Sequence, residues 1–138
     1  MTTKPRRILA VDFGDARTGL AATDWTGTIA LPLERIEARD PVQVVRAIVE
    51  LGAERQTELV VVGVPLSLDG AEGPRATRTR EFVERLRAAL PVPVETIDES
   101  HSTDEAHERL KRGGLKASQR KRVADSIAAL IILERYRN

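Results

Sequence analysis

The feature that most constrains the fold is a short, wholly apolar run that ends in an acidic residue. Residues 8–11 read Ile-Leu-Ala-Val, Asp12 follows directly, and Gly14 comes two positions later. A run of this length and composition is typical of a strand buried on both faces of a sheet. Burying an ionised carboxylate costs several kcal/mol unless a metal ion, another cation or hydrogen bonds offset it. Asp12 is therefore either a turn or capping residue or part of a cation-binding site.

Length and composition restrict the class of protein. The 138 residues predict a single domain over 1–138, and 41% hydrophobic with 31% charged residues is ordinary for a soluble globular protein. The absence of cysteine excludes disulfides and thiolate metal sites and fits a reducing cytoplasm. The apolar run after the basic residues 4–7 is too short for a signal peptide or a membrane span. We therefore expect a cytoplasmic protein with no membrane partner.

Charge is distributed unevenly along the chain. The net charge is +1, yet residues 107–138 hold nine Lys or Arg against three Asp or Glu, a difference of +6. The rest of the chain is consequently net acidic. Such asymmetry indicates either an anionic partner on one side of the molecule or a solvated helical face.

The hydrophobic pattern predicts an alternation of strands and helices. Strands are expected over 8–12, 17–23, 30–36, 59–63 and 92–97, and Pro32 favours an edge position for the third of them. Helices are expected from Pro41 to about Gly52, from Pro74 to about Leu90, from the capping box at Ser102 to 113–114, and from near Ser118 onward. The first three strands, joined by tight turns, predict an antiparallel meander, and the crossover helices predict a parallel portion. The expected fold class is α/β, a mixed five-stranded sheet (three antiparallel then parallel strands) with helices on both faces.

Acids from three parts of the chain are candidates for one site. The carboxyl ends of parallel strands meet at one edge of a sheet, which brings Asp12 together with the Asp98-Glu99 pair. Asp125 is a third candidate because it lies in an unusually apolar part of the last helix, although it could instead pair with Lys121 or Arg122 at helical spacing. Carboxylates without a cysteine or histidine cluster suit Mg²⁺ or Mn²⁺. Two such ions could activate a water and stabilise the leaving oxygen of a phosphodiester.

Four motifs in this order and spacing resemble a known family. They are Asp12-Phe-Gly14, Val62-Gly-Val-Pro-Leu-Ser-Leu-Asp-Gly70, Asp98-Glu99 and Val123-Ala-Asp-Ser-Ile-Ala-Ala129. Together they resemble the YqgF family, described as pre-16S rRNA nucleases and as Holliday-junction-resolvase-like proteins, over essentially the whole chain. The resemblance implies a ribonuclease H-like fold and metal-dependent cleavage of structured nucleic acid, first of all in 5′-end maturation of pre-16S rRNA. It maps the catalytic and metal-binding acids onto Asp12, Glu99 and Asp125.

Three positions depart from the family pattern. Ser100 stands where an arginine commonly follows the Asp-Glu pair, Asp15 where threonine is frequent and Ala16 where a basic residue is frequent. A missing guanidinium removes a candidate phosphate clamp, and an added acid could alter metal affinity or repel the substrate backbone. Arg17 keeps one cation near Asp12.

Basic residues are expected to bind the phosphate backbone in a salt-dependent, sequence-independent way. Most of them flank residues 113–118, which we expect to be mobile. With 3% aromatic residues no base-stacking platform is expected, so recognition should follow the structure of the nucleic acid rather than its sequence. The candidate nucleic-acid-binding residues are Arg17, Lys111, Arg112, Lys116, Arg120, Lys121 and Arg122.

Other functions remain open at the level of sequence. A Holliday-junction resolvase acting on branched DNA would cut two strands symmetrically and would favour a homodimer. A non-catalytic nucleic-acid-binding module is compatible with the three departures. Nucleotide binding and phosphotransfer, as in sugar-kinase-like folds, would need two such domains, and the glycine pattern matches neither phosphate-loop signature.

Overall fold

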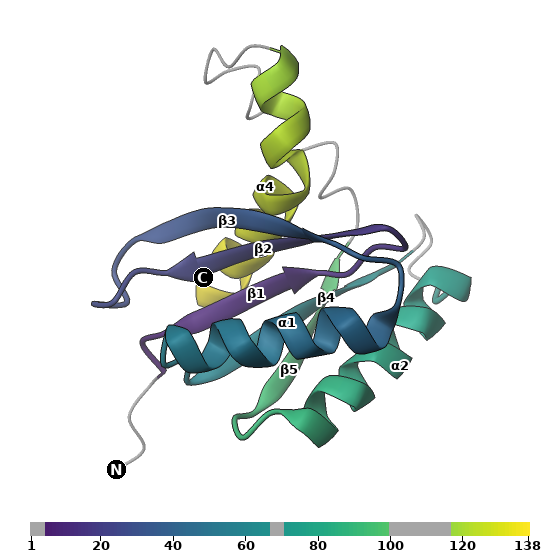
Figure 1. Ribbon diagram of the computed structural model, residues 1–138, viewed down its shortest axis with the longest axis horizontal. Helices are drawn as coiled ribbons and strands as arrows, with labels where there is room; N and C mark the ends of the chain where they lie inside the picture. Colours follow the sequence, from purple (N-terminus) through teal and green to yellow (C-terminus); the bar gives the residue numbers. More distant parts are fainter. Residues whose placement is uncertain (1–4, 67–70, 100–116) are drawn as a thin grey trace.

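The computed structural model describes residues 5–66, 71–99 and 117–138, and within the last helix it describes side chains from residue 126 onward. This part of the chain forms five strands and three helices (Figure 1). The strands are β1 (Ile8–Asp12), β2 (Arg17–Thr23), β3 (Ala30–Glu37), β4 (Leu59–Pro65) and β5 (Val94–Glu99). The helices are α1 (Pro41–Glu54), α2 (Pro74–Ala89) and α4 (Ala117–Arg137). The helix expected from Ser102 lies outside the described residues.

The strands form one sheet in the order β3-β2-β1-β4-β5. β1 pairs antiparallel with β2 on one side and parallel with β4 on the other, where Val11 lies level with Val62. β5 continues the parallel portion, and β3 closes the opposite side antiparallel to β2. The predicted meander, the parallel portion and the edge position of the strand that contains Pro32 are confirmed.

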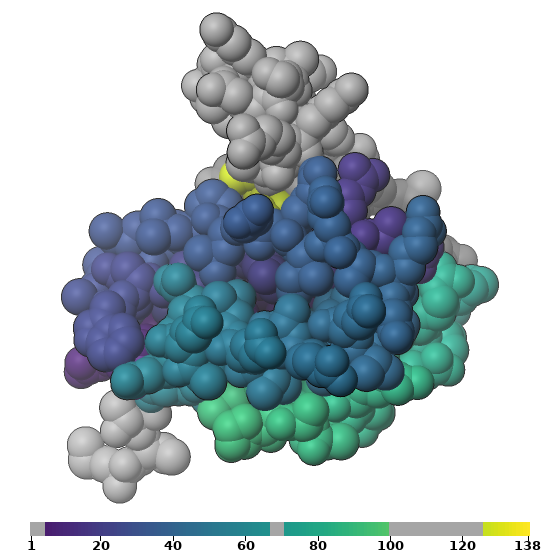
Figure 2. All heavy atoms as spheres, in the orientation of Figure 1, coloured from purple at the N-terminus to yellow at the C-terminus, as the bar shows by residue number. Residues whose placement is uncertain are grey.

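Helices cover both faces of the sheet, as expected from the apolar strands (Figure 1). Because side chains alternate along a strand, neighbouring residues of β1 enter two different cores. Leu9 and Val11 pack with α1 and α2, whereas Ile8 and Ala10 pack with α4. Figure 2 shows side chains of α1 spread over the near face, with those of α2 beside them. The helix contacts come from Val44, Ile48, Phe82 and Leu86 on one face and from Ala129, Ile132 and Leu133 on the other.

The helix ends follow the local signals in the sequence. The Asp40 side chain accepts a hydrogen bond of 2.9 Å from the Val42 N–H, and Pro41 occupies the first turn of α1. Pro74 likewise occupies the first turn of α2, where the N-cap residue Gly73 forms no side-chain cap. α4 begins at Ala117, one residue before the predicted start. None of the described helices is long and apolar enough to cross a membrane.

Strand boundaries differ slightly from expectation around proline. β4 continues to Pro65, two residues beyond the predicted end, and β5 begins at Val94 rather than at 92. Pro93 lacks an N–H, and it contributes only its carbonyl, which accepts a hydrogen bond of 3.0 Å from the Val60 N–H. The regular ladder therefore starts one residue later.

Gly63 gives a direct test of how α4 packs on the sheet. A Cβ added there would lie 2.5 Å from Ile132 Cδ1, and Ile132 is only 1% exposed, so it has little room to move. We expect Gly63→Ala to lower the free energy of unfolding, measured in urea, by about 1–3 kcal/mol. Ile132→Val removes Cδ1 and should restore part of this loss, although alone it costs about 0.5–1.5 kcal/mol. Strictly additive costs in the double variant would contradict the contact.

Candidate active site

Asp12 ends β1 inside the sheet rather than at its margin. Its Cα lies opposite Gly19 of β2, and its side chain is half-buried. By the alternation of the strand, Asp12 shares the α4 face with Ala10. The turn that follows carries Phe13 to the opposite face, where its ring stacks on Phe82 of α2 with 4.1 Å between centroids. This aromatic contact anchors the backbone next to Asp12.

Glu99 ends β5 and is the most deeply buried acid in the described part of the chain, at 4% exposure. Neither of its carboxylate oxygens receives a hydrogen bond there. The guanidinium of Arg135 in α4 forms an ion pair with Glu99 Oε1. Because a buried carboxylate needs compensating positive charge, Arg135 supplies at least part of what Glu99 requires at this position.

Gly63 lies between the two acids. Val11 is level with Val62, so Asp12 is level with Gly63 across the β1–β4 pair. On the other side Gly63 pairs with Ile97, two residues before Glu99, and a Cβ at Gly63 would lie 3.6 Å from Glu99 Cβ. Asp12 and Glu99 therefore share one face and one edge, with their strands two spacings apart, roughly 10 Å. We call this region the acid edge. The structure places these two predicted residues at one edge of the sheet, on either side of β4.

The third predicted acid is placed only by its backbone. Asp125 lies in α4, on the same helical stripe as Ala129 and Ile132, which pack on the sheet. The next residue, Ser126, donates a hydrogen bond to the Leu33 carbonyl of β3. α4 thus crosses the sheet from β3 at residue 126 towards β5 at Arg135. Where side chains are described, no group of three acids or histidines is close enough to hold a metal ion, so the convergence of Asp125 stays a prediction.

The predicted basic residues lie mostly beyond the described side chains. Arg17 is exposed at the start of β2, beside the acid edge. Lys111, Arg112 and Lys116 fall outside the described residues, and Arg120, Lys121 and Arg122 are described in backbone only. Figure 1 shows the first turns of α4, which carry these last three, extending past β3 and away from the sheet.

Sequence reasoning missed a second group of cations, at the start of α2. Arg78 forms an ion pair of 3.5 Å with Asp15, the family departure in the β1–β2 turn. Arg75 and Arg78 line a small hollow together with Gly14 and Asp15. The available signal was three arginines, at 75, 78 and 80, in a helix that starts directly after a glycine loop at the carboxyl end of a parallel strand.

Arg80 belongs to the same helix but is neutralised locally. Its guanidinium donates to both carboxylate oxygens of Glu72, at 2.5 and 3.1 Å. This bidentate pair lowers the pKa of Glu72 and raises the pKa of Arg80. Arg75 and Arg78 are better placed to meet an external anion, because the contact of Arg78 with Asp15 is single and longer, at 3.5 Å.

Gly14 tests whether the β1–β2 turn determines the shape of the site. A Cβ there would collide with the Arg17 carbonyl oxygen, a backbone atom that cannot swing aside. We expect Gly14→Ala to open the turn and to lower the free energy of unfolding by about 1–3 kcal/mol, measured by denaturant titration. Gly73→Ala is the matched control, because its added Cβ would meet no atom within 4 Å. Equal effects of the two substitutions would rule out the steric explanation.

Comparison with known proteins is consistent with this geometry. A sequence model described as "RuvX: Holliday junction resolvase" matches residues 6–138. A Streptomyces coelicolor protein named "Putative pre-16S rRNA nuclease" is 43% identical over 129 residues, which cover 93% of this chain and 77% of the relative. A Fusobacterium nucleatum protein of the same name is 41% identical over 135 residues, which cover 95% of this chain and 96% of the relative.

Solved structures show the same fold at low sequence identity. RuvC of T. thermophilus in complex with a Holliday junction substrate has a TM-score of 0.58 at 18% identity, covering 95% of this chain and 94% of RuvC. The fowlpox virus Holliday junction resolvase has a TM-score of 0.55 at 11% identity, covering 94% and 97%. The predicted ribonuclease H-like fold and the family that the motifs resemble are both confirmed. By the match over residues 6–138 and by relatives above 40% identity, the chain belongs to the RuvX family of nucleases.

Proposed function

We propose that this nuclease depends on a divalent metal ion and cleaves phosphodiester bonds in structured RNA during 5′-end maturation of pre-16S rRNA. The observation that carries the proposal is the acid edge, where Asp12 and the buried Glu99 flank Gly63 on one face of the sheet. The names of the relatives support RNA as the substrate. A cytoplasmic location fits a chain without cysteine and stays a prediction.

The residues at the acid edge fit a hard divalent cation. Glu99 offers a buried carboxylate, of which Oε1 meets the Arg135 guanidinium and Oε2 receives no hydrogen bond in the described structure. Asp12 adds a second carboxylate on the same face. In this proposal Asp12, Glu99 and Asp125 hold Mg²⁺ or Mn²⁺. When bound, the ion supplies an activated water and stabilises negative charge on the leaving oxygen. Arg135 provides the positive charge that Glu99 otherwise lacks.

The chain's own part in the reaction is to bind and orient the phosphate backbone. Arg17 at the start of β2 and Arg75 and Arg78 at the start of α2 border the acid edge. The remaining predicted contacts, Lys111, Arg112, Lys116, Arg120, Lys121 and Arg122, precede or begin α4. Guanidinium groups on two sides of a carboxylate pair would fix a phosphodiester over it.

Resolution of a Holliday junction is the second candidate function. The family model carries that description, and the fold is shared with RuvC in complex with a junction. A resolvase would need two acid edges related by two-fold symmetry, and hence a homodimer. Parallel assays with a pre-16S rRNA fragment and a four-way DNA junction, both with Mn²⁺, separate the substrates. Preferential cutting of the junction by a dimeric species in sedimentation would favour resolution over rRNA maturation.

Charge removal at the acid edge tests the proposed catalytic residues. We expect Asp12→Asn and Glu99→Gln to lower the cleavage rate about 100-fold or more, because carboxylates that hold a metal contribute several kcal/mol to catalysis. Affinity for substrate, measured by fluorescence anisotropy, should change by less than about threefold, since the backbone contacts come from other residues.

Two further variants complete this test. Asp98→Asn is the matched control, because Asp98 is exposed and lies on the opposite face of β5 from Glu99. The cleavage rate of this variant should remain near that of the wild type. Asp125→Asn tests the third proposed acid. A fall in cleavage rate as large as that of Asp12→Asn would support Asp125 as a member of the site. Wild-type rates for Asp12→Asn would overturn the assignment.

The Asp15–Arg78 ion pair generates a prediction about substrate affinity. Asp15→Asn should release Arg78 and lower the dissociation constant at low salt about two- to fivefold, in keeping with the small energy of an exposed pair. Arg78→Gln should raise the dissociation constant and reduce the slope of log K against log salt by about 0.7–0.9. Identical salt slopes for Arg78→Gln and wild type would show that Arg78 does not contact phosphate.

A further inference from the structure

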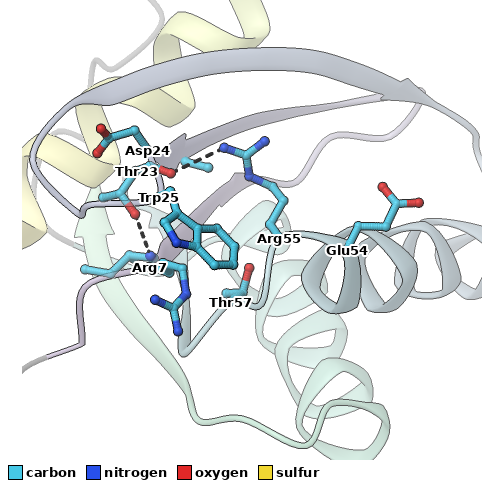
Figure 3. Close-up of a pocket in the computed structure, with 9 residues that line it drawn as sticks. Arg7, Thr23, Asp24, Trp25, Glu54, Arg55 and Thr57 are labelled. Atoms are coloured by element: carbon cyan, nitrogen blue, oxygen red, sulfur yellow. Dashed lines mark hydrogen bonds between the residues drawn. The ribbon is translucent and has the colours of Figure 1, made fainter.

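A pocket lies at the end of the sheet opposite the acid edge, between the start of β1, the end of β2 and the last turn of α1 (Figure 3). Its volume of about 220 Å³ is below the roughly 300–1,000 Å³ of sites for drug-sized ligands, so it suits one small ring system. The lining residues are Arg7, Ile8, Ala22, Thr23, Asp24, Trp25, Glu54, Arg55 and Thr57. We call this the Trp25 pocket.

Trp25 is the single tryptophan of the chain, and the residue is 60% exposed. An exposed indole is unusual, because this side chain has more apolar surface to bury than most others. The guanidinium of Arg7 lies over the ring, 4.9 Å from its centroid. Such a cation–π contact holds the indole in a fixed orientation and leaves much of its surface open to solvent.

The turn that carries Trp25 is rigid. The Asp24 carboxylate accepts hydrogen bonds from the Thr26 hydroxyl and from the N–H groups of Thr28 and Ile29, and these bonds lower the pKa of Asp24. Arg137 at the end of α4 donates to the carbonyls of Gly27 and Thr28. Because the turn is tied both within itself and to α4, the indole is preorganised for binding.

The charges around the pocket suit a phosphate next to a planar ring. The acids are occupied: Asp24 by the turn, and Glu58 by Arg7 at 3.4 Å. Figure 3 shows the carboxylate of Glu54 directed away from the indole. Arg55 donates one hydrogen bond of 3.3 Å, to the Thr23 carbonyl, and a guanidinium has five N–H donors in all. Arginine at the rim therefore retains donors for an anion.

We propose that the Trp25 pocket binds one unpaired nucleobase of a single-stranded segment of nucleic acid, which stacks on Trp25 while Arg55 faces the adjoining phosphate and Arg7 orients the indole. This site rests on the proposed function only in that the substrate is a nucleic acid. It departs from the expectation, drawn from 3% aromatic residues, that the chain offers no stacking platform, because Trp25 is exposed. One exposed aromatic ring is sufficient, because every base has a flat face that can stack.

The position of the pocket connects it to the acid edge. Ile8, which lines the pocket, and Asp12 are the first and last residues of β1, roughly 13 Å apart at about 3.3 Å per residue. A substrate whose structured part lies at the acid edge would reach the pocket with a short single-stranded flank. The Trp25 pocket would thereby favour substrates in which such a flank adjoins structured nucleic acid.

The single tryptophan makes the binding test specific to this site. Short single-stranded RNA and DNA oligonucleotides are titrated into the full chain in EDTA, and tryptophan fluorescence is followed. We expect saturable quenching with either oligonucleotide if the base is the recognised group, and with RNA alone if the ribose contributes. Absence of quenching at concentrations that saturate binding by anisotropy would overturn the proposal. A concentration-dependent blue shift without nucleic acid would also overturn it, since it would show self-association through Trp25.

Variants connect the pocket to substrate choice. Trp25→Ala should weaken binding of a duplex with a single-stranded flank by about tenfold or more and leave a flush duplex unchanged, as the loss of one stacked base predicts. Arg7→Ala should act in the same direction. Leu31→Ala is the matched control, because Leu31 is an exposed apolar residue of the neighbouring strand β3 outside the pocket. Circular dichroism checks that each variant is folded, and equal weakening of the flush duplex would overturn the proposal.

Base binding at the Trp25 pocket and cleavage at the acid edge can be lost independently. Asp12→Asn should retain full quenching while losing cleavage, because Asp12 lies at the other end of β1. Quenching without cleavage in the wild type would leave the pocket standing and remove the nuclease proposal. Cleavage without quenching would remove the pocket and leave the nuclease.

Discussion

The pairing of β1 along both of its edges is the constraint on which the rest of the structure depends. Antiparallel pairing with β2 and parallel pairing with β4 fix β1 in the middle of the sheet. Its last residue, Asp12, therefore lies among backbone groups that are already hydrogen-bonded, instead of at a free margin. The parallel partners β4 and β5 end on the same side, so their last residues lie at the same edge of the sheet as Asp12.

The electrostatics of the acid edge follow from this arrangement. Glu99 is buried because β5 ends beneath α4, and a carboxylate in that position needs a cation. Gly63, in the strand between the two acids, has no side chain to separate them, and Ile132 of α4 fills the space next to it. The same packing that stabilises the core thus isolates a pair of carboxylates, an arrangement that suits metal-assisted hydrolysis of a phosphodiester.

The two ends of the sheet differ in chemistry, and both suit parts of a nucleic acid. The acid edge, bordered by Arg17, Arg75 and Arg78, suits a phosphate backbone. The opposite end presents an aromatic ring held by Arg7. In the two proposals, a structured region binds at one end of β1 and its single-stranded flank at the other, so both ends of the sheet contribute affinity.

The sequence by itself determined the strands, the sheet with helices on both faces, the location of Asp12 and Glu99, and the family, because alternation, apolar periodicity and motif order are local properties of the chain. The tertiary structure decided the contacts between distant segments. Arg135 meets Glu99, Arg78 meets Asp15, and Trp25 is left exposed against Arg7 only because of how the helices and turns are oriented on the sheet. The direction in which α4 crosses the sheet, from β3 at Ser126 to β5 at Arg135, is the clearest example of a feature that the sequence does not predict. Hydrophobic periodicity states which side of a helix is buried, but the crossing angle depends on how side chains of both partners interdigitate, and that is settled only when they pack.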